Sequence, residues 1–315
     1  MRKKMLVVCT AELVLFLSGL FFYAKDRLNK KLDIFSPLPS FLTFSQNSQV
    51  STLDLWFPSS VLPKQNNEAP QISAQAGIVY DLTAGKLLFA KNPKRRLPMA
   101  SLTKIMTAVM AIEHPRDVYT VFKDDLVGED SMGLSEGETL SLNELLYGLI
   151  LTSGNDAAEA LARNTFGRTK FIIAMNNKAK SLGLSDTHFT NPTGLEGDGA
   201  QYTTPHDLLV ITRYALRYSL FRNVASAFDH HIPYSENHKE FYLENETNLL
   251  TSYPGIAGVK TGYTPEAGLC LVTYLNYKGH KIIGVILDSD NRRDEMKELL
   301  DYGLKIQGLT PPLHN

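Results

Sequence analysis

The order of strand-like and helix-like segments is the feature that most constrains the fold of this 315-residue chain. Residues 76–81 and 86–91 are short apolar segments joined by a turn, and they predict a hairpin at the start of the folded part. Residues 256–260, 269–277 and 281–288 predict three more strands. Helical patterns fill much of the chain between these two groups. The order predicts an α+β fold, an antiparallel sheet with helices on both sides plus a helical subdomain.

Helix signals divide the middle of the chain. Ser141 and Glu144 form a capping-box pattern, and Asp156 is predicted to cap the helix that follows. Gly183 and Pro205 are a typical helix stop and a typical helix start. Helices are therefore predicted from near Ser101 to Pro115 and over residues 142–151, 157–162, 171–182, 205–218 and 292–300.

The N-terminal region predicts a membrane anchor. Residues 5–24 form an apolar run of 20 residues with basic flanks, long enough as a helix to cross about 30 Å of hydrocarbon. Glu12 interrupts the run at a cost of about 2.5 kcal/mol or more if charged. We expect residues 1–31 to be a single-pass anchor, residues 32–73 a Pro- and Ser-rich linker, and residues 74–308 the main folded domain. The alternative is a signal peptide that is cleaved to release a secreted protein.

The charge balance and the lack of metal-ligand motifs argue against a nucleic-acid-binding protein and against a metalloprotein. Beyond residue 31 the chain holds 25 basic and 31 acidic residues, so it is a poor polyanion binder and nucleic acid is not an expected partner. The sequence contains neither His-Glu-x-x-His nor Cys-x-x-Cys, so no metal or cofactor is predicted. His206, His230 and His231 are expected to be surface residues on loops or at helix ends. Cys270 is expected to be a buried, inert thiol.

Ser101 and Lys104 stand three residues apart at the start of a predicted helix, so their side chains lie on one face and can touch. A serine is a good nucleophile only when a base takes its proton. A lysine serves as that base only if burial or a neighbouring cation lowers its pKa. Taken alone, the pattern fits this chemistry and a capped surface helix equally well.

Two further short motifs carry polar groups suited to the same chemistry. Ser153 and Asn155 flank a glycine between two predicted helices, where a second hydroxyl can relay a proton, although such a tripeptide is also an ordinary turn. Lys260, Thr261 and Gly262 follow an apolar strand and offer a positive charge, a hydroxyl for a carboxylate, and close backbone approach.

Together, in this order, the three motifs resemble those of the penicillin-recognising serine enzymes. Residues 98–108, 151–158 and 258–264 are similar to the low-molecular-mass D-alanyl-D-alanine carboxypeptidases of the S11 peptidase family, as are residues 188–195 and 245–250. The resemblance extends over roughly residues 74–305 and implies a fold like that of β-lactamases and transpeptidases.

The resemblance also implies roles. Ser101 would be acylated with Lys104 as its base, Ser153 and Asn155 would assist proton transfer and orient the substrate, and Lys260 would supply positive potential. The remaining implied roles are an oxyanion hole from the backbone N–H groups of Ser101 and Tyr263, and a carboxylate site from Thr261, Gly262 and Arg292, preferred by spacing over Arg293.

The implied substrates are peptidoglycan stem peptides, with β-lactams as covalent inhibitors, so the catalytic domain should lie outside the cytoplasmic membrane. Family members often have a C-terminal β-rich domain and an anchor helix. This sequence ends soon after its last predicted helix, which leaves anchoring to residues 5–24.

Three rival functions use the same fold. A D,D-endopeptidase shares all three motifs. A serine β-lactamase would need a carboxylate base such as a Glu-x-x-Leu-Asn string, which is absent from the sequence. A catalytically inactive envelope-binding protein would not need nucleophile, base and Lys-Thr-Gly to be intact together, as they are here.

Overall fold

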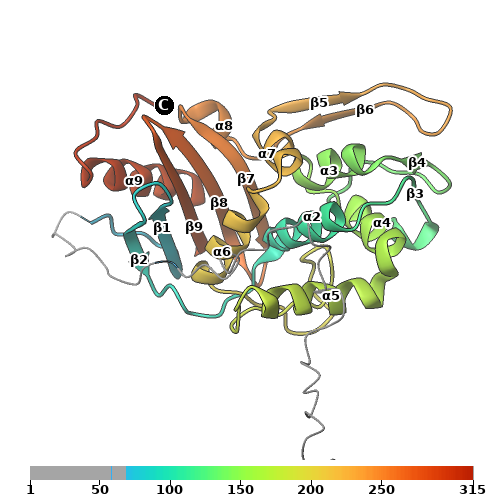
Figure 1. Cartoon of the computed structure of the whole chain (residues 1–315), viewed down its shortest axis with the longest axis horizontal. Helices are drawn as coiled ribbons and strands as arrows, with labels where there is room; N and C mark the ends of the chain where they lie inside the picture. The colour runs from blue at the N-terminus through green and yellow to red at the C-terminus, as the bar shows by residue number, and fades with distance from the viewer. Residues whose placement is uncertain (1–57, 59–68, 315) are drawn as a thin grey trace, which may run out of the picture. The chain divides into compact units, whose positions relative to one another are not determined.

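Strands from both ends of the chain meet in one five-stranded antiparallel sheet with the order β2-β1-β9-β8-β7. The computed structural model describes residue 58 and residues 69–314. The sheet confirms the predicted antiparallel arrangement, and its strands are β1 (Ala76–Asp81), β2 (Lys86–Lys91), β7 (Ile256–Thr264), β8 (Gly268–Tyr277) and β9 (His280–Ser289) (Figure 1).

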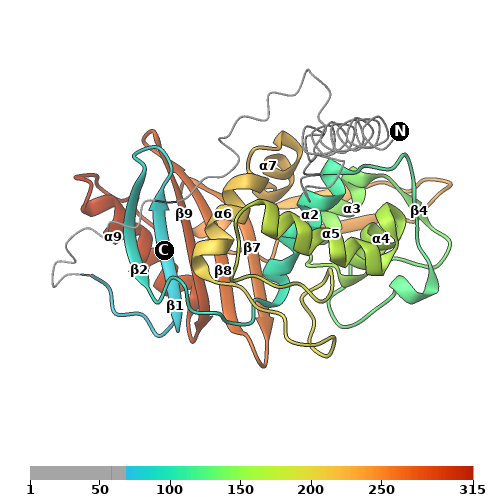
Figure 2. The same cartoon turned by 60° about the horizontal axis from the view of Figure 1, so that its bottom comes forward.

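Helices and short strand pairs occupy the chain between β2 and β7. Figure 2 shows most of the helices gathered beside the sheet, beyond β7, as the predicted helical subdomain. The elements are η3 (Ala100–Thr103), α2 (Lys104–Glu113), β3 (Tyr119–Thr120), η4 (Lys123–Asp125), β4 (Thr139–Leu140), α3 (Leu142–Ile150), α4 (Asn155–Phe166), α5 (Arg168–Ser181), α6 (Pro205–Ala215), α7 (Ser219–Ser226), β5 (Asp229–Ile232), β6 (Phe241–Glu244) and α8 (Leu249–Ser252), and α9 (Arg292–Lys305) follows β9.

Alternating side chains on the central strand β9 cover both faces of the sheet. Ile282 and Ile286 are buried with residues of α9 on one face. Ile283 and Val285 are buried in the larger core, on the face covered by α6 (Figure 1). Each such side chain contributes roughly 1.5–3 kcal/mol when fully buried. The sheet therefore has helices on both sides, as the sequence predicts.

Local capping explains where helices begin. The predicted capping box of α3 is present, since the Ser141 hydroxyl accepts from the Glu144 N–H and the Glu144 carboxylate accepts from the Ser141 N–H at 2.7 Å. The predicted cap at Asp156 is wrong. The helix begins at Asn155 after Gly154, and the Asp156 carboxylate binds a neighbouring loop instead.

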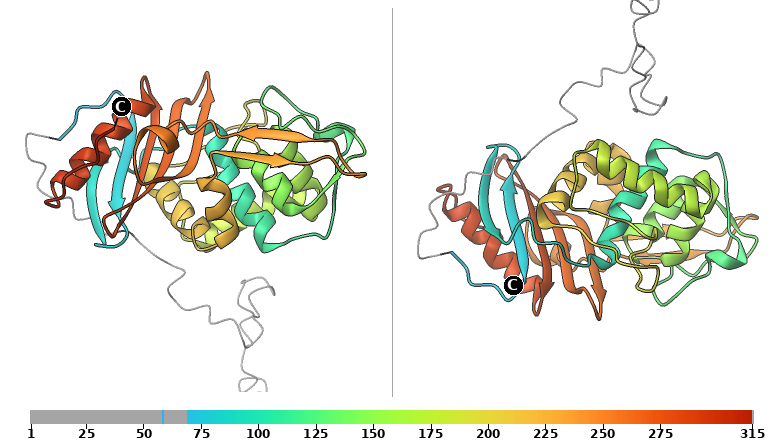
Figure 3. Two further views of the ribbon diagram at one scale, coloured as in Figure 1. Left: turned by 90° about the horizontal axis from the view of Figure 1, so that it is seen from above. Right: turned by 90° about the horizontal axis from the view of Figure 1, so that it is seen from below.

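Several elements differ from the expected ones. Helix α7 and the β5–β6 hairpin were not expected, and the hairpin extends alongside the helices (Figure 3). His230 and His231 lie in strand β5 rather than on a loop or helix end. Cys270 is fully buried, which confirms the predicted burial, and burial raises the pKa of its thiol to about 12.

Within residues 69–314, no helix combines the length and apolar character that a bilayer crossing requires. The apolar run 5–24, predicted as an anchor, and most of the predicted linker lie outside the described residues.

Candidate active site

The amine of Lys104 is surrounded by three oxygen atoms from separate parts of the fold. Lys104 is the first residue of α2, and Ser101 lies in the preceding turn η3. The Lys104 Nζ atom is 2.9 Å from Ser101 Oγ, 2.7 Å from Asn155 Oδ1 and 2.8 Å from the carbonyl oxygen of Thr193. The predicted serine–lysine contact is therefore present.

The types of these oxygens are compatible with a neutral lysine. Both carbonyl oxygens can only accept hydrogen bonds, so each must accept one from an N–H group of Lys104. In the neutral amine, the remaining lone pair then faces the Ser101 hydroxyl. Burial lowers the pKa of Lys104 well below its usual range, and the nearby Lys260 charge lowers this pKa further. A buried neutral amine beside a hydroxyl can act as a general base.

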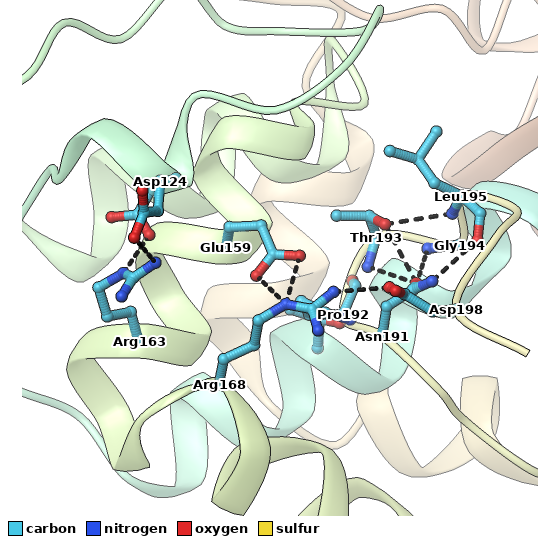
Figure 4. Close-up of polar contacts among 12 residues, drawn as sticks. Asp124, Glu159, Arg163, Arg168, Asn191, Pro192, Thr193, Gly194, Leu195 and Asp198 are labelled. Atoms are coloured by element: carbon cyan, nitrogen blue, oxygen red, sulfur yellow. Dashed lines mark hydrogen bonds and ion pairs between the residues drawn. The ribbon is translucent and has the colours of Figure 1, made fainter.

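A tight turn fixes the Thr193 carbonyl (Figure 4). The Asn191 carboxamide accepts from the backbone N–H of Thr193 at 3.2 Å and of Gly194 at 2.7 Å, and donates to the carbonyl of Leu195 at 2.8 Å. These bonds close the turn on itself and leave the Thr193 carbonyl directed at Lys104.

Glycine is required at position 194 of this turn. Its φ is +93°, and a Cβ atom there would lie 2.0 Å from the carbonyl oxygen of Ala100 and 2.9 Å from the backbone nitrogen of Ser101. The turn therefore packs directly against the backbone that carries the nucleophile. Arg168 ties the far end of the loop to α4, with its guanidinium 2.9 Å from Glu159 and 2.7 Å from Asp198 (Figure 4).

Strained backbone occurs at two of the three motifs. Ala100, just before Ser101, has φ +47°, and Ser153 has φ +58°. Such left-handed conformations cost about 1–3 kcal/mol for a non-glycine residue and persist only where the surroundings fix them. Here Gly154 donates to the carbonyl of Gly148 at 2.9 Å, and Asn155 donates to that of Asp130 at 2.8 Å.

Ser153 and Asn155 are both buried, but they differ in their contact with Lys104. Asn155 bonds to Lys104 directly, whereas Ser153 is not among the three partners of the lysine amine. The Asn155 Nδ2 group has no hydrogen-bond partner among the described residues. It is left as a donor for a group that enters the site.

Strand β7 is the sheet edge that faces η3, and the Lys260-Thr261-Gly262 motif lies within it rather than after it. A Cβ atom on Gly262 would lie 3.1 Å from the Ser101 nitrogen, so this glycine allows β7 to approach the nucleophile closely. The backbone of Tyr263 is next along the strand, and its side chain is exposed.

Two basic side chains lie at this edge of the sheet, Lys260 within β7 and Arg292 in α9. Lys260 Nζ is buried with no hydrogen-bond partner in the described part of the chain, and burial lowers the pKa of Lys260 to about 8. Arg292, in the first turn of α9, donates through Nη1 to the carbonyl of Gly262 at 2.7 Å. The choice of Arg292 over Arg293 as the arginine of the site stays a prediction.

Comparison with known proteins identifies the family of this chain. Residues 63–291 match the family Peptidase_S11, D-alanyl-D-alanine carboxypeptidase. The chain belongs to this family.

The S11 match is supported by individual relatives. The D-alanyl-D-alanine carboxypeptidase DacF of Bacillus subtilis is 32% identical, over 82% of this chain and 70% of the relative. DacB2 of Mycobacterium tuberculosis is 34% identical, over 80% and 89% of the two chains. The crystal structure of the Streptomyces K15 DD-transpeptidase aligns with a TM-score of 0.70 at 32% identity, covering 75% of this chain and 99% of that one.

The structure thus brings together residues from all three predicted motifs of this S11 peptidase, and it adds two groups that had no predicted role. One is the Thr193 carbonyl. The other is Glu246, whose carboxylate accepts from the Thr261 hydroxyl at 3.2 Å and lies 3.7 Å from Lys260 Nζ. Both belong to segments that carry the family resemblance, residues 188–195 and 245–250. This resemblance was the one signal in the sequence that pointed to them.

Proposed function

We propose that this S11 peptidase removes the terminal D-alanine from peptidoglycan stem peptides through an acyl-enzyme on Ser101. The observation that carries the proposal is the environment of Lys104, whose two N–H groups are held by the carbonyl oxygens of Asn155 and Thr193. Its lone pair then has one neighbour, the Ser101 hydroxyl at 2.9 Å.

The reaction follows from this geometry. Lys104 takes the proton as Ser101 Oγ attacks the carbonyl carbon of the penultimate D-alanine. The peptide C–N bond breaks, the leaving D-alanine amine takes the proton, and an ester on Ser101 remains. Water then attacks the ester, Lys104 accepts the water proton, and cleavage of the C–O bond returns the proton to Ser101. Ser153, buried beside Asn155, is assigned to proton transfer in these steps.

Donors from the helical side and from strand β7 bind the substrate. The N–H groups of Ser101 and Tyr263 stabilise the oxyanion, and the free amide of Asn155 holds a substrate carbonyl. The terminal carboxylate binds near Thr261, with Lys260 and Arg292 supplying positive charge. Close approach of β7 at Gly262 brings these groups to the nucleophile. β-Lactams, which carry a similar carboxylate, acylate the same serine.

The substrate also sets the location. Peptidoglycan stem peptides lie outside the cytoplasmic membrane, so we place the catalytic domain there. We propose that residues 5–24 anchor the protein as a single span and that residues 32–73 link this anchor to the domain.

The test compares the wild-type protein with Ser101→Ala, using Ser185→Ala as the control because Ser185 is exposed. D-Alanine release from a stem pentapeptide should fall at least about a thousandfold in Ser101→Ala, and labelling by a fluorescent penicillin should disappear. Thermal unfolding should hardly change. Turnover near wild type in Ser101→Ala would contradict the proposal.

Product analysis separates the related activities. Release of D-alanine from the pentapeptide identifies a carboxypeptidase. Cleavage of cross-linked dimers identifies an endopeptidase, and transfer of the peptide to an added amine such as glycine identifies a transpeptidase. Rapid multiple-turnover hydrolysis of penicillin would instead identify a β-lactamase.

A further inference from the structure

Glu246 occupies the groups that the proposed function assigns to the substrate carboxylate. Its Oε2 atom accepts the Thr261 hydroxyl at 3.2 Å and lies 3.7 Å from Lys260 Nζ. The Thr261 hydroxyl has a single proton to donate. A substrate carboxylate that needs this proton therefore competes with Glu246 for it.

The backbone of Glu246 is fixed while its carboxylate is free to leave. The Glu246 N–H donates to the carbonyl of Leu151 at 3.1 Å, and its own carbonyl accepts from Asn248 at 3.0 Å. The flanking residues Asn245 and Thr247 are buried, whereas the Glu246 side chain is 44% exposed. Rotation of this side chain into solvent leaves these backbone bonds intact.

Electrostatics makes the two carboxylates alternatives. Two anions about 4 Å apart repel each other, and the repulsion is stronger near a buried site than in open water. One carboxylate at a time can therefore pair closely with Lys260 and Thr261.

We propose that Glu246 is a specificity-determining residue that holds Thr261 and Lys260 in the free enzyme and is displaced by the terminal carboxylate of the substrate. The inference rests on the proposed function. It implies that Glu246 weakens the binding of ligands that the site recognises through a carboxylate alone. The released D-alanine is such a ligand, so return of Glu246 helps to expel it after each acylation.

The experiment compares wild type, Glu246→Gln and Glu246→Asp, with Glu244→Gln as the control. Glu244 is an exposed carboxylate two residues away on β6. In Glu246→Gln, KM for a peptide ending in D-Ala-D-Ala should fall roughly fivefold, as expected for loss of a partly exposed competing charge. Inhibition by free D-alanine should strengthen by a similar factor. Glu246→Asp, one methylene shorter, should change in the same direction.

A neutral substrate supplies the second readout. For the same peptide ending in D-alaninamide, which lacks the carboxylate, Glu246→Gln should leave KM unchanged. A purely structural role for Glu246 would alter both substrates together. If the wild type releases D-alanine but Glu246→Gln shows unchanged or weaker binding of the acid and of free D-alanine, this proposal is wrong. If the wild type releases no D-alanine and takes no penicillin label, the proposed function itself fails.

Discussion

Two buried lysines in the site carry out different tasks because their surroundings differ. The Lys104 amine lies within hydrogen-bond distance of two carbonyl oxygens and of the Ser101 hydroxyl. Lys260 has no hydrogen-bond partner among the described residues, and its nearest carboxylate, that of Glu246, is 3.7 Å away. The Lys260 charge also lowers the pKa of Lys104. In the proposed mechanism, Lys104 is the base and Lys260 supplies the positive charge that favours its neutral form.

The pair predicts a bell-shaped pH dependence of kcat/KM. Activity should rise with pH as Lys104 loses its proton, because only the neutral amine acts as a base. Activity should fall as pH rises through about 8, where Lys260 loses its charge. Measuring kcat/KM against pH for wild type and Lys260→Arg checks this. The arginine stays charged, so the fall near pH 8 should disappear even if the variant is slower. An unchanged fall near pH 8 would assign it to another group.

Sequence motifs predict side chains better than they predict backbone groups. The motifs identified Ser101, Lys104 and Asn155 because each of these motif positions requires a side chain of a particular chemistry. The Thr193 carbonyl has no such signature, since every residue has a carbonyl and its direction depends on the Asn191 turn. The role of Glu246 is equally hidden, because a glutamate in a loop is usually a solvated surface residue.

At the scale of elements, the first turn of α4 organises the loop that precedes β4. The Asp156 carboxylate accepts from the backbone N–H groups of Met132 at 3.0 Å, Gly133 at 3.1 Å and Leu134 at 2.9 Å. It also accepts the Ser131 hydroxyl. The same loop supplies the carbonyl of Asp130 to Asn155, so one buried carboxylate holds the loop against the catalytic asparagine.

Removing this carboxylate should therefore destabilise the fold. Asp156→Ala leaves several buried N–H groups without an acceptor, and we expect a loss of about 3 kcal/mol in the free energy of unfolding. This corresponds to a fall in unfolding temperature of roughly 10 °C for a domain of this size. Calorimetry or circular dichroism measures it. Asp124→Ala is the matched control, since the Asp124 side chain is 83% exposed, and it should change stability by less than about 0.5 kcal/mol. Equal effects of the two substitutions would contradict this account.

Element boundaries were predictable where local chemistry marks them. The hairpin 76–91 and the start of α3 were predicted closely, because a turn and a capping box fix them. Helix α7 was missed because only three residues separate it from α6, so the two helical patterns merge. The hairpin β5–β6 was missed because β5 contains Asp229, His230 and His231 and lacks the apolar alternation of a core strand.

At the scale of the whole molecule, the site lies where the helical part of the chain meets the sheet. Strand β7 is the last strand of the sheet and contacts η3 and α7. Ser101 and Lys104 come from the helical side, while Lys260 and Thr261 come from the strand. The segment around Glu246 joins the two sides, because its backbone bonds Leu151 and its side chain bonds Thr261. Catalysis therefore depends on how the sheet and the helices pack against each other. The sequence motifs do not specify this packing.

An anchor at residues 5–24 would hold this enzyme at the membrane surface. Residues 5–24 are long enough as a helix to span about 30 Å of hydrocarbon. Glu12 makes the free energy of membrane insertion less favourable by about 2.5 kcal/mol or more when charged. We expect the full-length protein to remain in the membrane fraction after an alkaline carbonate wash and to keep its original N-terminus. Glu12→Leu should strengthen this retention, because it removes the one carboxyl group from the run. Detergent should release the protein with D-alanine-releasing activity intact, since the residues assigned to catalysis and substrate binding lie between positions 101 and 292. A mature protein that begins near Leu20 and is recovered free of membranes would show instead that the segment is a cleaved signal peptide.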